Sequence, residues 1–274
     1  CSYFFMGGEM TIQLRQICLV ARKLEPVIQD LTAILGINRC FVDPGVGVFG
    51  LENTLMPIGR NFLEVVAPIE ENTAGGRYLD RRNGDGGYMV ITQADSLESQ
   101  QQVRQNALDN GVRVAHETIR EDWNLCQLHP GDLKAAFFEI ESDSHNDFQG
   151  HWHPVGGLGW EDKVKQDITV DYLGVELQSA DPLELAELWG KVAGLNIERN
   201  GAEFSMDFNN ATVRFVEAED GRGPGLGGLD IAVANRDRFQ RCHSLAFINF
   251  LADFNSNIHD LAAKTRGNGR VFFR

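Results

Sequence analysis

The sequence predicts an α+β fold in which four β-α-β-β-β modules form two domains. The first observation is that residues 16–36 read as a short apolar strand, a turn, an amphipathic helix and a closing glycine. The same order returns at residues 88–111 and 174–194, and it begins again at Asp230. Each helix is then followed by apolar runs separated by turn residues. Three copies that share one register make chance similarity between strand-helix units the weaker explanation.

The helix ends carry capping signals. Asp95 and Asp181 are each followed three residues later by a Glu, which is typical of an N-cap carboxylate with an acidic first turn. Pro182 follows the second of these caps, at a position where a helix accepts proline. A glycine stands where the left-handed residue after a helix is expected, at Gly36, Gly111 and Gly194.

Apolar runs predict the strands that follow each helix. In the first module they lie around Phe41 and at residues 46–51, 55–58 and 62–66. The later modules repeat them at residues 112–116, 125–128, 135–140, 196–199, 204–208 and 212–217. The last module is compressed, with a helix-like region at 259–265 and a short strand at 271–273. Residues 45–50 fit the pattern GxGxxG, but they follow a helix, so we predict a glycine-rich strand or hairpin and no dinucleotide site.

Serial modules of this kind, with a Glu in the last strand as in Leu63-Glu64-Val65-Val66-Ala67-Pro68, resemble the vicinal oxygen chelate superfamily, which includes glyoxalase I, extradiol dioxygenases, epimerases and resistance proteins. The resemblance covers residues 12–274. It implies two cup-shaped mixed sheets, each made by a pair of modules. It also implies a functional first domain at 12–142, a linker at 143–167 and a degenerate second domain at 168–274. Residues 1–11 read as a leader.

The resemblance places four ligand positions in the first cup, at Gln16, Glu64, Tyr88 and Glu139. Carboxylate and amide oxygens would suit a divalent metal ion such as Zn, Ni, Mn, Mg or Fe. Tyr88 departs from the pattern, because a neutral phenol is a poor ligand and suits a hydrogen bond to substrate better. A metal-free cup that binds a ligand with Glu64, Glu139 and Tyr88 therefore remains an alternative.

Several histidines are further candidates. His129 stands before the strand that carries Glu139 and could act as an acid or base, although it could equally bond to a nearby carbonyl. The linker contains His145, His151 and His153 together with Trp152 and Trp160. His151 and His153 could chelate a metal, the aromatic residues could pack against both halves, or the linker could cover the cup and contribute a His or Trp to the ligand.

The second half has lost the ligand pattern. Gly174 and Asp230 occupy the first-strand positions, and Arg214 lies near the last-strand position of the third module. Arg214 could bind a substrate carboxylate, or it could form a structural ion pair.

Composition excludes some classes of function. The 274 residues carry 39 acidic and 25 basic side chains, for a net charge of -14, which disfavours nucleic acid as a partner. The sequence contains neither an apolar run long enough for a membrane span nor the pattern of a signal peptide. Five cysteines without a CxxC pattern indicate free thiols in a reducing cytoplasm.

We therefore expect a lyase or isomerase of the glyoxalase type, acting on a small oxygenated or carbonyl substrate with or without the assistance of a metal ion. The residues expected at its site are Gln16, Glu64, Tyr88, His129, Glu139, His151, His153 and Arg214. The alternative is a non-catalytic small-molecule binder of the resistance or sequestration type. An extradiol-type dioxygenase is disfavoured, because none of the four ligand places holds His. We expect no nucleotide cofactor, and a monomer or homodimer.

Overall fold

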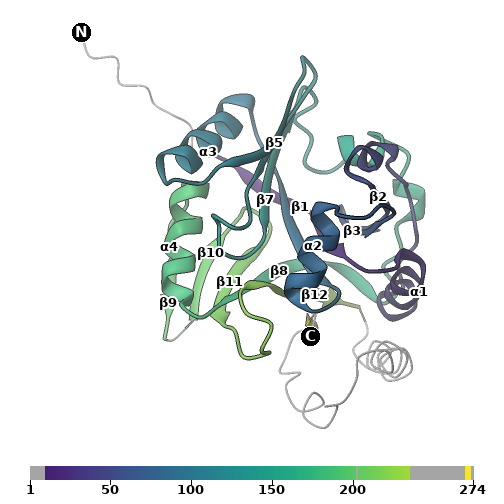
Figure 1. Ribbon diagram of the computed structural model, residues 1–274. Coiled ribbons are helices and arrows are strands. Elements are labelled where there is room, and N and C mark those ends of the chain that lie inside the picture. Colours follow the sequence, from purple (N-terminus) through teal and green to yellow (C-terminus); the bar gives the residue numbers. More distant parts are fainter. Residues whose placement is uncertain (1–9, 202, 235–268, 273–274) are drawn as a thin grey trace.

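The computed structural model describes residues 10–201, 203–234 and 269–272, and within them the chain forms two mixed β-sheets (Figure 1). The first sheet has seven strands in the order β2-β3-β1-β4-β7-β6-β5. Their bounds are β1 Ile12–Val20, β2 Leu51–Ile58, β3 Asn61–Pro68, β4 Gly86–Ala94, β5 Val114–Ile119, β6 Trp123–Leu128 and β7 Phe137–Asp143. This α+β architecture confirms the expected fold class.

The second sheet has six described strands in the order β13-β12-β8-β11-β10-β9. Their bounds are β8 Thr169–Ser179, β9 Glu198–Asn200, β10 Glu203–Asp207, β11 Thr212–Glu217, β12 Gly225–Val233 and β13 Gly269–Phe272. The strands of the two sheets pair in the same way. In both sheets the first strand of a module pairs in parallel with the last strand of that module, and the first strands of two consecutive modules pair antiparallel.

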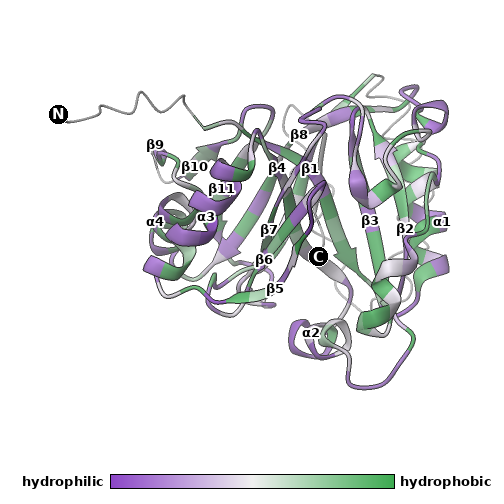
Figure 2. Cartoon of the chain, turned by 90° about the horizontal axis from the view of Figure 1, so that it is seen from above, coloured by the Kyte–Doolittle hydropathy of each residue, from purple (hydrophilic) through white to green (hydrophobic). Residues whose placement is uncertain are grey.

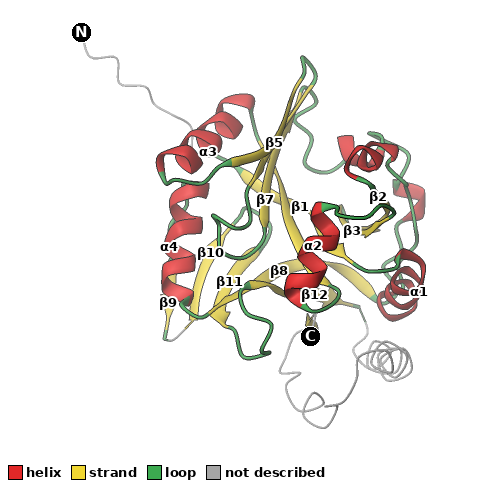
Figure 3. Cartoon of the chain, viewed as in Figure 1, coloured by secondary structure: helices red, strands yellow, loops and turns green. Residues whose placement is uncertain are grey.

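Four α-helices cover the sheets within the described residues (Figure 3). They are α1 Leu24–Leu35, α2 Ala74–Arg82, α3 Leu97–Asp109 and α4 Pro182–Ala193. Helices α3 and α4 lie side by side, and α1 lies on the opposite side of the molecule (Figures 1 and 2). In this part of the chain no helix is both long and apolar enough to cross a membrane.

In the described residues, buried hydrophobic side chains form two clusters. The larger cluster joins both sheets, with Phe138 from β7 stacked on Trp189 from α4, and Trp189 against Phe215 from β11. Figure 2 shows apolar residues along the strands of both sheets. The smaller cluster lies on the other face of the first sheet, which we call the inner face. Because one cluster contains residues of both halves, the division into two domains stays a prediction.

Three details of the sequence interpretation are wrong. Residues 46–51 do not form a strand, since Pro44–Phe49 is a 3-10 helix whose first turn is capped by Asp43, which accepts from Gly45 N at 2.8 Å. The glycine-rich strand or hairpin expected at 45–50 is therefore this helix. The strand expected around Phe41 is only an isolated bridge to Leu55, so the first module contributes three strands to the seven-stranded sheet.

The cap of α3 and the existence of α2 were also misjudged. Ser96, not Asp95, caps α3, because its hydroxyl accepts from Ser99 N, while Asp95 accepts from the backbone N–H of Thr11. Helix α2 connects the two modules and was not expected. In contrast, Asp181 caps α4 as expected, accepting from Glu184 N at 2.9 Å. The helix-like region expected at 259–265 lies outside the described residues.

Candidate functional site

The inner face of the first sheet brings Gln16 and Glu64 together, as expected. Gln16 on β1 donates from Nε2 to Glu64 Oε2 at 2.9 Å, and Asn53 on β2 donates from Nδ2 to Glu64 Oε1 at 2.6 Å. The register that pairs Cys18 with Glu64 places a buried thiol beside the same carboxylate. Burial raises the pKa of Glu64, and the hydrogen bonds from Asn53, Cys18 and Gln16 oppose the increase.

Residues 144–167, which we call the strap, cross this inner face. Trp152 is buried within it and donates from its indole Nε1 to Gln16 Oε1 at 2.9 Å. Trp160 packs edge-on against Phe62, with ring centroids 4.9 Å apart. The strap thus contributes Trp152, Val155 and Trp160 to the smaller core cluster. The strap therefore covers the inner face, as one of the alternatives expected, while the contribution of a His or Trp to a ligand stays a prediction.

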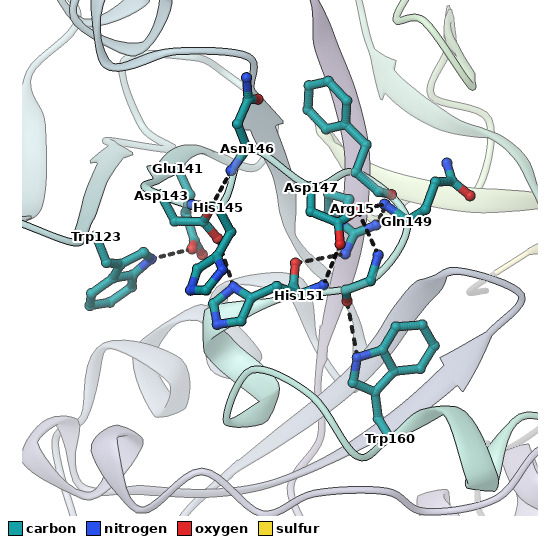
Figure 4. Close-up of polar contacts among 12 residues, drawn as sticks. Arg15, Trp123, Glu141, Asp143, His145, Asn146, Asp147, Gln149, His151 and Trp160 are labelled. Carbon is teal, nitrogen blue, oxygen red and sulfur yellow. Dashed lines mark hydrogen bonds and ion pairs between the residues drawn. The ribbon is translucent and has the colours of Figure 1, made fainter.

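Arg15 holds the strap in place (Figure 4). A β-bulge between Leu14 and Gln16 sets Arg15 apart from the regular pairing with β4. Its guanidinium donates to the backbone carbonyls of Arg60, Phe148 and His151, and it lies 5.1 Å from the ring centroid of Trp152. Burial lowers the pKa of Arg15 to about 10, so the side chain is still charged at neutral pH.

Glu139 lies on β7 with Glu141 two residues further on, so both carboxyl groups are on the inner face. Both are buried, and Trp123 on β6 donates from Nε1 to Glu141 Oε2 at 2.6 Å. Among the described residues, Oε2 of Glu139 and Oε1 of Glu141 have no hydrogen-bond partner. Burial raises the pKa of Glu139 to about 7, hydrogen bonds from Glu141 and Gln127 oppose this increase, and the charge of Glu64 adds to it. Burial and the neighbouring Glu139 raise the pKa of Glu141 as well.

Two histidines of the strap, His145 and His151, lie next to Glu141 and Asp143 (Figure 4). The His151 ring stacks on His145 with centroids 3.7 Å apart, and His151 Nδ1 is 3.0 Å from Asp143 Oδ2. His153 stacks on Trp123, with centroids 4.0 Å apart, and burial lowers its pKa. These rings hold the strap against β6 and β7.

His129 and Tyr88 are placed differently from the expectation. His129 lies in the turn after β6, where Nδ1 accepts from Gly131 N and faces Asp132 at 3.9 Å. Tyr88 sits at a register shift of β4, and its ring contacts Tyr78 and Phe137 edge-on, both at 5.0 Å. The pairing of Met89 with Phe137 matches that of Gln16 with Phe62, so the residue equivalent to Gln16 is Met89.

Arg214 lies in the second sheet, at the position equivalent to Glu64. It pairs in register with Glu176, as Glu64 pairs with Cys18. Its Nε and Nη2 donate to the two oxygens of Asp230 at 2.7 and 3.0 Å, and Nη1 donates to Glu176 Oε2 at 2.8 Å. In the described residues, Arg214 therefore forms the structural ion pair and does not offer a free guanidinium.

The residues that the resemblance assigns to a metal ion do not fit one in this arrangement. Gln16 Oε1 accepts the indole N–H of Trp152, and both oxygens of Glu64 accept amide N–H groups. Met89, at the fourth place, offers a thioether sulfur, whereas hard divalent ions prefer oxygen. In the described part of the chain, no group of three His, Cys, Asp or Glu side chains is arranged to hold a metal ion.

Sequence reasoning missed several residues of this site. Glu141 could have been found, because it lies two residues after Glu139 and so shares its face of the strand. Gln93 follows from the same alternation along β4. No sequence pattern pointed to Arg15 or Asn53. The contact between Trp152 and Gln16 could not be predicted from residue spacing either, because it joins residues 136 positions apart.

Comparison with known proteins agrees with this fold. No protein-family model matches the chain, and no curated protein matches its sequence. A mutant of 4-hydroxymandelate synthase from Streptomyces coelicolor matches at a TM-score of 0.60 and 13% identity, covering 87% of this chain and 76% of that one. A methylmalonyl-CoA epimerase solved with methylmalonyl-CoA and NH4+ is 18% identical, covers 50% of this chain and 98% of its own, and has a TM-score of 0.43. The chain therefore shares the fold of the 4-hydroxymandelate synthase structure, in agreement with the β-α-β-β-β modules that the sequence predicts.

Proposed function

We propose that the protein is an isomerase or lyase that moves a proton next to a carbonyl group of a small oxygenated substrate, on the inner face of the first sheet. The observation that carries this proposal is the state of Glu139. It is buried, its Oε2 has no hydrogen-bond partner within residues 10–201, 203–234 and 269–272, and its pKa is raised to about 7. A carboxyl group with a pKa near the working pH can both accept and return a proton.

In the proposed reaction the Glu139 carboxylate removes the proton from the carbon beside the substrate carbonyl. The C–H electron pair becomes the C=C bond of an enediol, and the carbonyl oxygen takes a proton from the Glu141 carboxylic acid. Glu139 then returns its proton to the same carbon or to the neighbouring one, and Glu141 recovers a proton from an enediol hydroxyl. The result is exchange or epimerisation in the first case and isomerisation in the second, with no net consumption of protons.

A divalent metal ion is not part of this proposal, because its predicted donors Gln16 and Glu64 are hydrogen-bonded to one another, to Asn53 and to Trp152. These hydrogen bonds instead fix the positions of the side chains next to Glu139 on the inner face. A Tyr88 hydrogen bond to substrate oxygen stays a prediction, as does an acid-base role for His129.

The second candidate is the non-catalytic binder, and the aromatic lining favours it. Tyr78, Tyr88 and Phe137 form an edge-to-face series on the inner face, and Phe62 and Trp160 form a second pair there. Such a surface suits an apolar or aromatic molecule that is held but not converted.

Proton exchange in D₂O separates the two candidates. The protein, first dialysed against EDTA, is incubated with dihydroxyacetone or glyceraldehyde, and the loss of the carbon-bound proton next to the carbonyl is followed by ¹H NMR. We expect exchange with the wild type and at least a hundredfold slower exchange with Glu139→Gln, the loss typical of a removed general base. Binding of these compounds without exchange would favour the binder, and equal exchange by both proteins would refute the role of Glu139.

A further inference from the structure

Gln93 lies at the end of β4, on the same face as Ile91, and is the starting point for a further inference. The register pairs Gln93 with Glu141 on the adjacent strand β7. Its side chain is fully buried, and neither Nε2 nor Oε1 has a hydrogen-bond partner in the part of the chain that the structure describes. Buried amides in native proteins nearly always have partners, and those without one are frequently found at sites that bind a ligand or water.

The unpartnered atoms of Gln93 are accompanied by two more on β7. Glu141 Oε1 and Glu139 Oε2 are buried and unpartnered, while the other Glu141 oxygen accepts the indole N–H of Trp123. Side chains on one face of adjacent strands have Cβ atoms about 5 Å apart. One small molecule can therefore reach the amide of Gln93 and both carboxyl groups.

The charges around these atoms decide what kind of molecule fits. Arg15 interacts electrostatically with Glu141, but its guanidinium donates to the backbone carbonyls of Arg60, Phe148 and His151. The guanidinium N–H groups of Arg15 are therefore not directed toward a ligand carboxylate. Glu64 and Asp143 add negative charge next to the pair. A second anion in this buried environment would be repelled with little screening.

We propose that Gln93, Glu139 and Glu141 form a subsite for an uncharged small hydroxycarbonyl compound and that this subsite rejects the matching carboxylate. The proposal deepens the proposed function and rests on it for the carbonyl group. Gln93 Nε2 donates to a ligand oxygen, Gln93 Oε1 accepts from a ligand hydroxyl, and the protonated Oε1 of Glu141 donates to the ligand carbonyl oxygen. Trp123, which fixes the other Glu141 oxygen, holds that carboxyl group in position.

Binding is measured by saturation-transfer NMR and isothermal titration with two probes of similar size, neutral dihydroxyacetone and anionic glycerate. We expect the wild type to bind dihydroxyacetone at least tenfold more tightly than glycerate. The variant Gln93→Met should weaken dihydroxyacetone binding by about tenfold or more, because the bound oxygen atoms lose their partner. Gln101→Met, at an exposed position on α3, is the matched control and should bind as the wild type does.

Glu139→Gln provides a second variant with the same shape and, at pH 8, one negative charge fewer, because the pKa of Glu139 is about 7. At pH 8 it should bind glycerate more tightly than the wild type, whereas a Glu139 that does not face the ligand would leave the preference unchanged. Equal binding of both probes by the wild type, no binding of dihydroxyacetone, or unchanged binding by Gln93→Met would each overturn the subsite. The expected binding pattern without proton exchange would leave the subsite standing and refute only the proposed reaction.

Discussion

The inner face of the first sheet and the equivalent positions of the second sheet use the same backbone register for opposite purposes. In the second sheet Arg214 is hydrogen-bonded by the carboxylates of Glu176 and Asp230. In the first sheet the equivalent residue is Glu64, which accepts from neutral amides. Nearby, Glu139 and Glu141 are buried without a cation bonded to either of them in the described residues.

Under the proposed function, one module is structural in one copy and reactive in another. The second sheet pairs its buried charges with one another, as Arg214 does with Glu176 and Asp230. In the first sheet, burial raises the pKa of Glu141 and raises the pKa of Glu139 to about 7, so that the Glu139 proton exchanges near neutral pH. The predictions below test this contrast.

The largest expected effect comes from the second sheet. Arg214→Met should lower the free energy of unfolding by about 3–5 kcal/mol, because Glu176 and Asp230 are left buried without their cation. Urea denaturation followed by circular dichroism measures the change. Arg104→Met removes a half-exposed ion pair with Glu117 and should cost no more than about 1 kcal/mol. Equal effects of the two substitutions would show that the Arg214 cluster is not a buried ion pair.

The next effect concerns pH and the first sheet. The pKa of Glu139 is raised from 4.5 to about 7 on folding, so the folded protein binds the proton more tightly than the unfolded chain. The resulting stabilisation is fully present below pH 4.5 and is lost as the pH rises through about 7, by up to about 3 kcal/mol. Denaturation between pH 4.5 and 8 should show this fall in the wild type and a shallower one in Glu139→Gln. Identical slopes would contradict the raised pKa.

A smaller effect is expected where the strap meets the sheet. Trp152→Phe keeps most of the ring volume but removes the indole N–H that Gln16 Oε1 accepts. Leaving this buried oxygen unpaired should cost about 1–3 kcal/mol of stability. Thermal unfolding of the variant, compared with Phe62→Leu as a control for packing alone, measures the loss. A double variant with Gln16→Leu should recover part of it, and no recovery would exclude the hydrogen bond as the cause.

Gln93→Met should change stability in the opposite direction. Replacing a buried amide that lacks partners by an apolar side chain of similar size should stabilise the free protein by about 1–2 kcal/mol. The melting temperature should therefore rise while ligand binding is lost. A clear fall in the melting temperature would indicate that the amide is satisfied within the folded protein.

Divalent metal ions should have the smallest effect. Because Gln16 and Glu64 are engaged in hydrogen bonds, Zn²⁺, Mn²⁺ or Mg²⁺ at millimolar concentration should leave the melting temperature unchanged within about 1 °C. Elemental analysis of untagged protein complements this measurement. A saturable rise of several degrees in the melting temperature that disappears in a Glu64→Ala, Glu139→Ala variant would support a metal-chelating site after all.

Much of the fold was predictable because the module repeats. The strand at Thr212–Glu217 has the predicted bounds, and Arg214 takes the position equivalent to Glu64. Residues 46–51 misled because the alternation of Val and Gly imitates a strand, whereas Asp43 and Pro44 begin a 3-10 helix there. The hydrogen bond from Gly45 N to Asp43 therefore outweighed the weak strand preference of the alternating Val and Gly residues.

The candidate site was less predictable than the fold. Tyr88 was assigned one residue away from the equivalent position because a register shift in β4 leaves no mark in the sequence. Trp152 and Gln16 meet only because the strap folds back over the sheet, which spacing alone does not reveal. Glu64 and Glu139 were found because both stand in the last strand of a module, where the repeat fixes their face.

The most direct test of the central claim is the titration of the Glu139 carboxyl carbon by ¹³C NMR in protein labelled at glutamate, with Glu139→Gln used for assignment. The account predicts a glutamate resonance that titrates with a midpoint near pH 7 in the wild type and is missing from the variant. If every glutamate carboxyl titrates below pH 5, the first sheet holds no carboxyl group ready to exchange a proton near neutrality, and the proposed reaction loses its basis.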